Sequence, residues 1–177
     1  MAITMKRQGY GQVEPNHLSG IVTGQIYAQL PAASSINQLE QGQFAKYDYA
    51  AGEVNFTGDG EFMLVYNEEK LYDERKQSHK DFVYKTEDFT DKSLYPRLIR
   101  TYVGDIITTN TIEVANDSDT KEVGTASLAV GDYLEISATG FLTKAESKPA
   151  AGNMAWKVVK EYTMPDGQPG VKIQRVQ

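Results

Sequence analysis

Apolar and polar residues alternate with a period of two along residues 128–144. After Val-Gly-Asp at residues 130–132 the chain reads Tyr-Leu-Glu-Ile-Ser, breaks at residues 138–140 with Ala-Thr-Gly, and resumes with Phe-Leu-Thr-Lys. Successive side chains of a strand point to opposite faces, so this alternation around a glycine turn predicts a β-hairpin. A second Val-Gly-Asp, at residues 103–105, precedes Ile-Ile-Thr-Thr. The C-terminal half is therefore predicted to be a β meander.

A second meander is predicted upstream of the most polar part of the chain. Its three β runs are separated by turns that contain glycine, and they span residues 46–49, 53–56 and 61–66. In the third run Phe62, Leu64 and Tyr66 share one face, while Met63 and Val65 share the other. Because both faces are apolar, the second face also needs a cover, and the N-terminal segment is the candidate.

The rest of the chain adds more short strands and little helix. Strands are predicted at residues 98–103, 106–114, 155–163 and 171–176, with a Pro-Asp-Gly turn before the last one. Residues 34–44 fit either a short helix or a loop that leads into a strand, and the polar residues 67–91 fit a long excursion with one helical turn at most. Many short strands at this spacing predict a mainly β fold, either a small β-barrel or a sandwich built from meanders.

Residues 1–33 have a different character. They contain scattered glycines and prolines, and their apolar residues follow no steady period. Ordering a backbone costs roughly 1–2 kcal/mol per residue, so a segment without a contiguous apolar face does not fold alone. We interpret the segment as an extended arm that lies along its own β domain or along a neighbouring subunit, with a poorly ordered terminus as the alternative. The predicted interface residues of the arm are Tyr10, Val13, Leu18, Ile21, Ile26, Tyr27 and Leu30.

The chain of 177 residues is long enough for one sizeable core or two small lobes. We expect three parts: the arm (1–33), an N-terminal β lobe with the polar excursion (34–93) and a C-terminal barrel-like lobe (94–177). The net charge of -6 argues against a nucleic-acid partner, because phosphate contacts need clustered Lys and Arg. No apolar run approaches membrane-spanning length, so we expect a soluble protein made in the cytoplasm, with no membrane partner.

Candidate chemistry is sparse. The chain has no cysteine, and His17 and His79 lack metal-ligand spacing. Asp-Ser-Asp at residues 117–119 begins like a calcium loop, but the required glycine and distal glutamate are missing. We therefore predict no catalytic residue, no cofactor and no metal. Eleven tyrosines suit subunit interfaces and sheet rims, although ordinary strand preference explains them as well.

Several segments resemble small structural proteins of tailed bacteriophages, of the capsid-decorating or head-auxiliary kind. They are GQVEPNHLS at residues 11–19, TGQIYAQLP at 23–31, residues 52–68, Val-Gly-Asp at 130–132 and Met-Pro-Asp-Gly at 164–167. The resemblance implies a non-enzymatic virion protein on the capsid surface that stabilises the shell against packaged DNA. Its partners would be the major capsid protein, gripped by the arm, and further copies of itself on the shell.

Two alternatives stay open at this point. One is a head-fibre base, neck or tail component of the same kind of virion. The other is a carbohydrate- or receptor-binding β module, in which Trp156 and the tyrosines would form a stacking platform. A tryptophan in a predicted strand is, however, more typical of a core residue.

Overall fold

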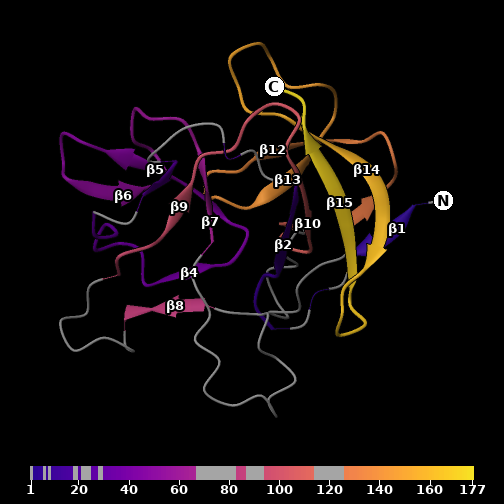
Figure 1. The fold of residues 1–177 in the computed structure, drawn as a ribbon, viewed down its shortest axis with the longest axis horizontal. Coiled ribbons are helices and arrows are strands. Elements are labelled where there is room, and N and C mark those ends of the chain that lie inside the picture. Colours follow the sequence, from indigo (N-terminus) through magenta and orange to yellow (C-terminus); the bar gives the residue numbers. More distant parts are fainter. Residues whose placement is uncertain are drawn as a thin grey trace.

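The computed structural model describes residues 2–5, 7, 9–17, 20, 25–27, 30–66, 83–86, 94–113 and 126–177. These residues contain strands and no α-helix (Figure 1), which confirms the mainly β prediction. Their sheets are open rather than closed into a barrel. The strands are β1 (Ile3–Met5), β2 (Val13–His17), β3 (Ile26–Tyr27), β4 (Gln38–Glu40), β5 (Phe44–Asp48), β6 (Glu53–Asn55), β7 (Met63–Val65), β8 (Val83–Lys85), β9 (Leu98–Ile99), β10 (Ile106–Thr109), β11 (Ala126–Leu128), β12 (Tyr133–Ile136), β13 (Leu142–Ala145), β14 (Trp156–Thr163) and β15 (Pro169–Arg175).

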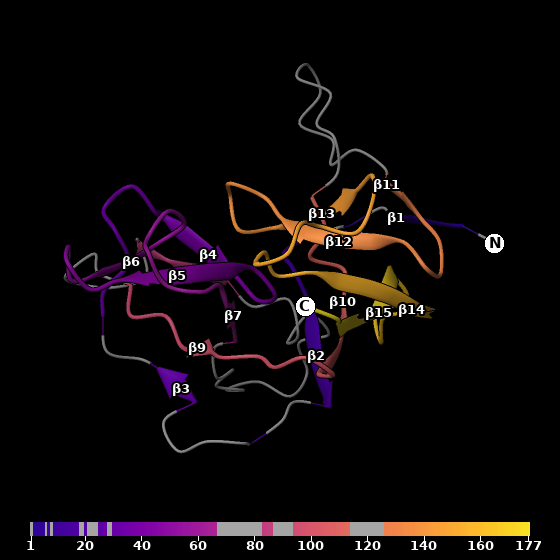
Figure 2. The same cartoon turned by 90° about the horizontal axis from the view of Figure 1, so that it is seen from above.

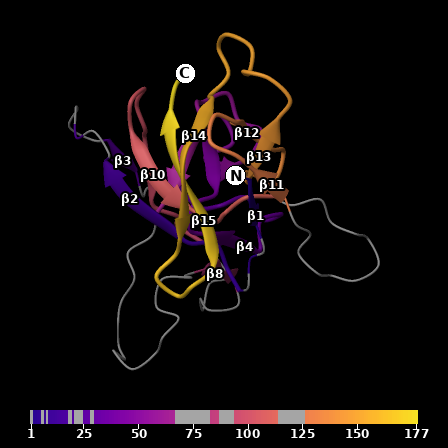
Figure 3. The same cartoon turned by 90° about the vertical axis from the view of Figure 1, so that its right-hand side faces the viewer.

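An antiparallel sheet of six strands, in the order β13-β12-β14-β15-β10-β2, forms the C-terminal half of the molecule (Figure 3). The predicted hairpin is its β12–β13 pair, in which Ile136 lies opposite Leu142. The predicted Pro-Asp-Gly turn joins β14 to β15, and this long hairpin forms the middle of the sheet. Strand β2, from the N-terminal segment, is the outer strand beside β10.

A second sheet of five strands has the order β3-β9-β7-β5-β6. The predicted meander supplies β5, β6 and β7, whereas β3 comes from the N-terminal segment. Strand β9 pairs with β7 through Leu64 and Ile99. The expected boundary between residues 93 and 94 therefore does not separate the sheets, because β9 completes the sheet that the preceding residues begin. Residues 34–44 supply β4 and the start of β5, not a helix.

Strand β7 contributes residues to two apolar clusters. Figure 2 shows β7 from above, between the β5–β6 pair and the six-stranded sheet. Leu64 belongs to the first cluster, with Phe62 and Tyr66 packed against it. Met63 and Val65 belong to the second cluster. The predicted division of this run into two apolar faces is confirmed. The first cluster also contains Trp156, Ile107, Leu134, Leu142 and Ile173, and the second contains Leu39, Tyr47, Val54, Leu94 and Leu98.

The two Val-Gly-Asp sequences form the same turn, at residues 102–105 and 129–132. In each turn the aspartate N–H donates to the carbonyl three residues earlier, at 3.0 and 3.1 Å. The aspartate Oδ2 accepts the N–H of that same residue, at 2.8 and 2.9 Å. The first turn explains why β9 is shorter than predicted. The carboxylate of Asp105 accepts a hydrogen bond from the N–H of Tyr102. If the strand continued, this N–H would instead donate to a neighbouring strand.

Strand β10 also ends earlier than predicted, at Thr109. The next residue, Asn110, turns to the N-terminal segment, because its Oδ1 accepts the N–H of Gln12 at 2.8 Å and its N–H donates to the Gln12 carbonyl at 3.2 Å. The last residue of the predicted strand, Val114, lies outside the described part of the chain. The two small sheets, β1–β11 and β4–β8, flank the larger ones.

Candidate functional site

The described strands of the N-terminal segment pair with strands of their own chain, the first of the two positions considered for the segment. It supplies β1, β2 and β3 to three different sheets. Of its predicted interface residues, Val13 packs against the first apolar cluster, and Tyr27 and Leu30 pack against the second. These contacts provide the cover that the second face of β7 needs. They also occupy these three side chains within the chain.

The other predicted interface residues have different surroundings. Ile26, on β3, is 47% exposed. Tyr10 is half-buried, with the Lys85 ammonium 5.2 Å from its ring centroid. Leu18 and Ile21 lie outside the described residues. Contact with another molecule therefore stays a prediction, and Ile26 is the described member best placed to make it.

A buried ion pair attaches the segment to β4. Arg7 Nη1 lies 2.9 Å from Glu40 Oε2, and the two side chains are only 11% and 5% exposed. The same carboxylate oxygen accepts the N–H of Gly11 at 2.7 Å. A Cβ at Gly11 would lie 2.6 Å from the carbonyl oxygen of Gln41, which belongs to the backbone and cannot move aside cheaply. Glycine at residue 11 is therefore required for this close approach.

Side-chain hydrogen bonds continue the attachment at the next residue. The Gln12 carbonyl accepts from Thr109 Oγ1 at 2.7 Å, and Gln12 Nε2 donates to Asp166 Oδ2 at 2.6 Å. Thr111 Oγ1 donates to the Gln41 carbonyl at 2.7 Å. The backbone of the segment at residues 11 and 12 is thus fixed by buried hydrogen bonds to Glu40, Asn110 and Thr109, which costs little compared with leaving these groups unpaired. Sequence periodicity missed these anchors because they are isolated polar residues.

A cleft of about 500 Å³ opens between the two large sheets. Residues 59–62 and Lys46 line one side, Glu135 and Ile136 of β12 line the other, and residues 152–154 and Arg175 complete it. The lining combines apolar side chains, such as Phe62 and Met154, with charges of both signs. This composition suits a small amphipathic ligand or a peptide side chain.

The cleft's arginine connects β15 with the loops beside the five-stranded sheet. Arg175 Nη1 donates to the carbonyl of Thr101 and, at 3.0 Å, to Thr101 Oγ1. Glu61 lies between two arginines: its Oε1 is 2.7 Å from Arg100 Nε and its Oε2 is 3.8 Å from Arg175 Nη2. Burial lowers the pKa of Arg175, and the negative charge of Glu61 opposes that shift. Arg175 and Glu61 are therefore engaged in contacts within the protein.

The residues considered for chemistry are placed as follows. His17 is the last residue of β2, while His79 and the calcium-like residues 117–119 lie outside the described residues. Within the described ranges, no group of three or more His, Cys, Asp or Glu could hold a metal ion. Trp156 is fully buried in the first cluster. The stacking platform considered for Trp156 is therefore wrong, because its ring is needed in the core.

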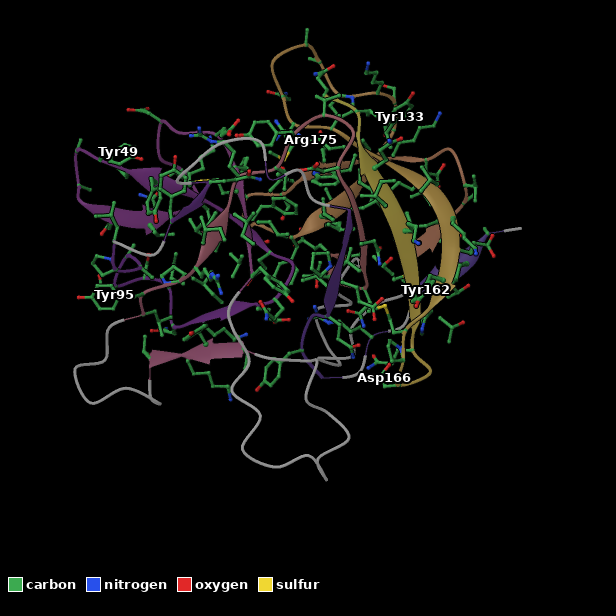
Figure 4. All side chains as sticks on the ribbon, viewed as in Figure 1. Tyr49, Tyr95, Tyr133, Tyr162, Asp166 and Arg175 are labelled. Carbon is green, nitrogen blue, oxygen red and sulfur yellow. The ribbon has the colours of Figure 1, made fainter. Side chains whose placement is uncertain are left out.

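Two tyrosines that the sequence did not single out lie at the far end of the five-stranded sheet (Figure 4). Tyr49 is 73% exposed and Tyr95 is 51% exposed. The Tyr49 ring lies 5.6 Å from that of Tyr47, which in turn meets Tyr27 edge-on at 5.4 Å. The turn that carries Tyr49 is braced by Asp48, whose Oδ1 accepts the N–H of Ala51 at 2.9 Å, and this bond lowers the pKa of Asp48.

Comparisons with known proteins add no relative. No protein-family description, curated protein or solved structure matches this chain. A search of the described residues for a helix long and apolar enough to cross a membrane finds none.

Proposed function

We propose that this chain is a non-enzymatic virion protein that binds the outside of an assembled bacteriophage capsid and stabilises it. One observation carries the proposal: the N-terminal segment provides the outer strand of both large sheets. Among the described residues, β2 pairs with β10 alone and β3 pairs with β9 alone. The sequence resemblance to capsid-decorating proteins agrees with this role.

An outer strand is suited to assembly because one of its sides has no neighbouring strand. The N–H and C=O groups on that side can pair with a strand of another subunit. On β3 the exposed Ile26 would add an apolar contact to such a pairing. Each contact can be weak, because a shell repeats it at every equivalent position and several contacts per molecule sum.

The buried anchors explain how a short segment could resist force from the shell. The Arg7–Glu40 pair and the bonds around Gln12 attach its middle to the core. Removing one partner of a buried ion pair costs about 3–5 kcal/mol, because the other charge is left buried and unpaired, so Arg7 and Glu40 favour the attached position of the segment. In this proposal the anchors transmit the load from the shell to the β domain.

Shell binding by the full-length chain tests the proposal. Purified protein is mixed with capsid shells assembled without it and sedimented, and the Ile26→Lys variant is compared with the parent. We expect Ile26→Lys to weaken binding about tenfold, because a lysine on an outer strand opposes pairing with another strand. Val103→Lys is the matched control, since Val103 is 66% exposed but lies on the turn before β10.

Two results would contradict this function. One is the absence of the parent protein from sedimented shells. The other is equal binding by Ile26→Lys and Val103→Lys, which would exclude β3 from the contact. A labelled chain seen at the neck or tail of the virion, and not on the capsid, would favour the alternative of a neck, tail or fibre-base component.

A carbohydrate- or receptor-binding role is the second candidate, and Tyr49 is the observation that favours it. A ring that is exposed and held in position by a neighbouring ring can stack on a sugar at little cost in conformational entropy. Glycan-array binding by the parent, lost in Tyr49→Ala and kept in Tyr133→Ala, would support this role. An array without binding would remove it.

A further inference from the structure

Three lysines gather on the outer face of the β14–β15 hairpin. Lys157 lies opposite Tyr133 of β12 on one side and Gln174 of β15 on the other, and Lys160 lies opposite Lys172. Tyr133 and Tyr162 lie at the two ends of this face (Figure 4). We call the surface formed by Tyr133, Lys157, Lys160, Tyr162 and Lys172 the lysine face.

The lysine face contains an unfavourable pair. Lys160 and Lys172 are directly opposite each other in the antiparallel register, and like charges in that position repel. The chain has 24 acidic residues against 18 Lys and Arg, so acidic neighbours are abundant in its composition. Lys160 and Lys172 are nevertheless neighbours, so a carboxylate from another molecule would relieve their repulsion.

In the described part of the chain, the acidic residues near the lysine face lie at its margins. Glu135 is two residues beyond Tyr133 on β12. Glu14 lies on β2 at the end of the same cross-strand row, because it is opposite Thr108, which is opposite Lys172. The intervening Glu161 lies opposite Val171, which belongs to the buried cluster, so its side chain leaves toward the other face of the hairpin. None of these positions interrupts the cross-strand row of Lys160 and Lys172.

Aromatic and apolar groups complete the surface. The Lys157 ammonium is 5.7 Å from the Tyr133 ring centroid, and the Lys172 ammonium is 6.0 Å from that of Tyr162, so both charges are held near rings. Val159 of β14 is 37% exposed. Val130 is 58% exposed, on the turn whose Gly131 N–H donates to the Val158 carbonyl. Positive charge is thus combined with exposed apolar groups.

We propose that the lysine face is a docking surface for an acidic segment of a partner protein. Charge complementarity supplies the choice of partner. A polyanion such as DNA would meet three lysines on a molecule of net charge -6, too few phosphate contacts to overcome the overall repulsion. An anionic membrane surface typically requires about four to eight clustered Lys or Arg. Carboxylates flanked by apolar side chains fit both the lysines and the valines.

This inference goes beyond the capsid-binding proposal and does not depend on it. It concerns the face of the six-stranded sheet, whereas the capsid proposal concerns the outer strands β2 and β3. Either can fail without the other.

A peptide titration tests the docking surface. The full chain, labelled with ¹⁵N, is titrated with a hexaglutamate peptide at low salt, with hexalysine as the charge control. We expect shifts of the amide signals of β14 and β15, and binding about fivefold weaker in the double variant Lys160→Gln/Lys172→Gln. Lys148→Gln is the matched control, because Lys148 is exposed in a loop outside the sheet, and it should bind like the parent.

A second measurement is independent of any ligand. Removing the repulsion should make Lys160→Gln more resistant to urea than the parent, while Lys148→Gln should leave the urea midpoint unchanged. Hexaglutamate that does not bind, or binds equally to the double variant, would overturn the proposal. So would tighter binding of duplex DNA or of phosphatidylglycerol vesicles at the same amides. An unchanged urea midpoint for Lys160→Gln would remove the repulsion on which the argument rests.

Discussion

The two Val-Gly-Asp turns allow a comparison of one local structure in two environments. Gly104 and Gly131 have the same φ of 101°, and both N–H groups donate at 2.8 Å to a carbonyl of the β14–β15 hairpin. The aspartates differ. Asp105 is fully buried, whereas the side chain of Asp132 is 25% exposed and forms an ion pair of 2.7 Å with Lys144.

The comparison separates the shape of a turn from its contribution to stability. The shape follows from glycine, which accepts a positive φ, and from an aspartate that closes on the N–H three residues earlier. The contribution depends on burial, because a buried N–H without a partner costs more than one that water can reach. The Val-Gly-Asp sequence is therefore expected to contribute more to stability in the first turn than in the second.

The largest expected difference is between Asp105→Ala and Asp132→Ala. Asp105→Ala removes a fully buried carboxylate and with it the acceptor of the Tyr102 N–H, and should lower the free energy of unfolding by about 3 kcal/mol. Asp132→Ala should lower it by about 1 kcal/mol, because solvent can replace the lost contacts. Urea denaturation followed by Trp156 fluorescence measures both. Equal losses would show that burial does not distinguish the turns.

Alanine at the two glycines should give matched effects. A Cβ at Gly104 or at Gly131 would have no atom within 4 Å, so the cost is that of the backbone conformation alone. We expect Gly104→Ala and Gly131→Ala each to lower the free energy of unfolding by about 1–2 kcal/mol. The same denaturation assay applies, with Gly152→Ala as a further glycine of positive φ and open surroundings. A clear difference between the first two variants would mean that tertiary contacts strain one turn.

The stability contributed by the second turn should depend on pH, with a smaller effect than those of the aspartate and glycine substitutions. Lys144 hydrogen-bonds to Asp132 and lowers the pKa of that carboxyl group below its ordinary value. The folded state thus favours the ionised form, so the stabilisation is present above pH 4 or so and is lost as the pH falls through the lowered pKa. Lys144→Gln should remove about 0.5 kcal/mol at neutral pH and little at low pH. Urea denaturation of parent and variant measures this difference. A difference in the free energy of unfolding that is the same at neutral and at low pH would contradict the ion pair between Asp132 and Lys144.

The smallest effects are expected at the exposed valines. Val103 and Val130 are 66% and 58% exposed, so Val103→Ser and Val130→Ser should each change the free energy of unfolding by less than about 0.5 kcal/mol. Only Val130→Ser should also weaken hexaglutamate binding, since Val130 borders the lysine face. Unequal changes in the free energy of unfolding would contradict the similar exposure of the two valines. A loss of hexaglutamate binding in Val103→Ser would contradict the position of the docking surface beside Val130.

Much of the fold could be predicted from periodicity. The β12–β13 hairpin, the three runs that became β5, β6 and β7, and the assignment of Leu64 and Val65 to opposite faces all follow from a period of two. Trp156 was expected in the core for the same reason. A two-residue strand such as β3 is too short to leave a periodic signal, so its pairing with β9 across about 70 residues of chain was not visible.

The candidate site was less accessible to sequence reasoning. Leu30 and Tyr27 were recognised as apolar groups in need of a partner, but the sequence did not say whether that partner is the same chain. Glu40, Glu61 and Arg175 carried no signal, because single charged residues in an acidic chain are normally on the surface. The lysine face depends on the register of β14 and β15. The bulge between Val158 and Lys160 shifts this register, so the sequence alone did not show that Lys160 lies opposite Lys172.

The amino-acid sequence by itself determined the local structures of this protein: which residues alternate between two faces, and where glycine and aspartate turn the chain. Tertiary structure alone decided which strands became neighbours, which carboxylates were buried, and which cations were left facing one another. The physical reason is range. Turns and alternation depend on residues a few positions apart, whereas burial and charge pairing depend on side chains brought together from distant parts of the chain.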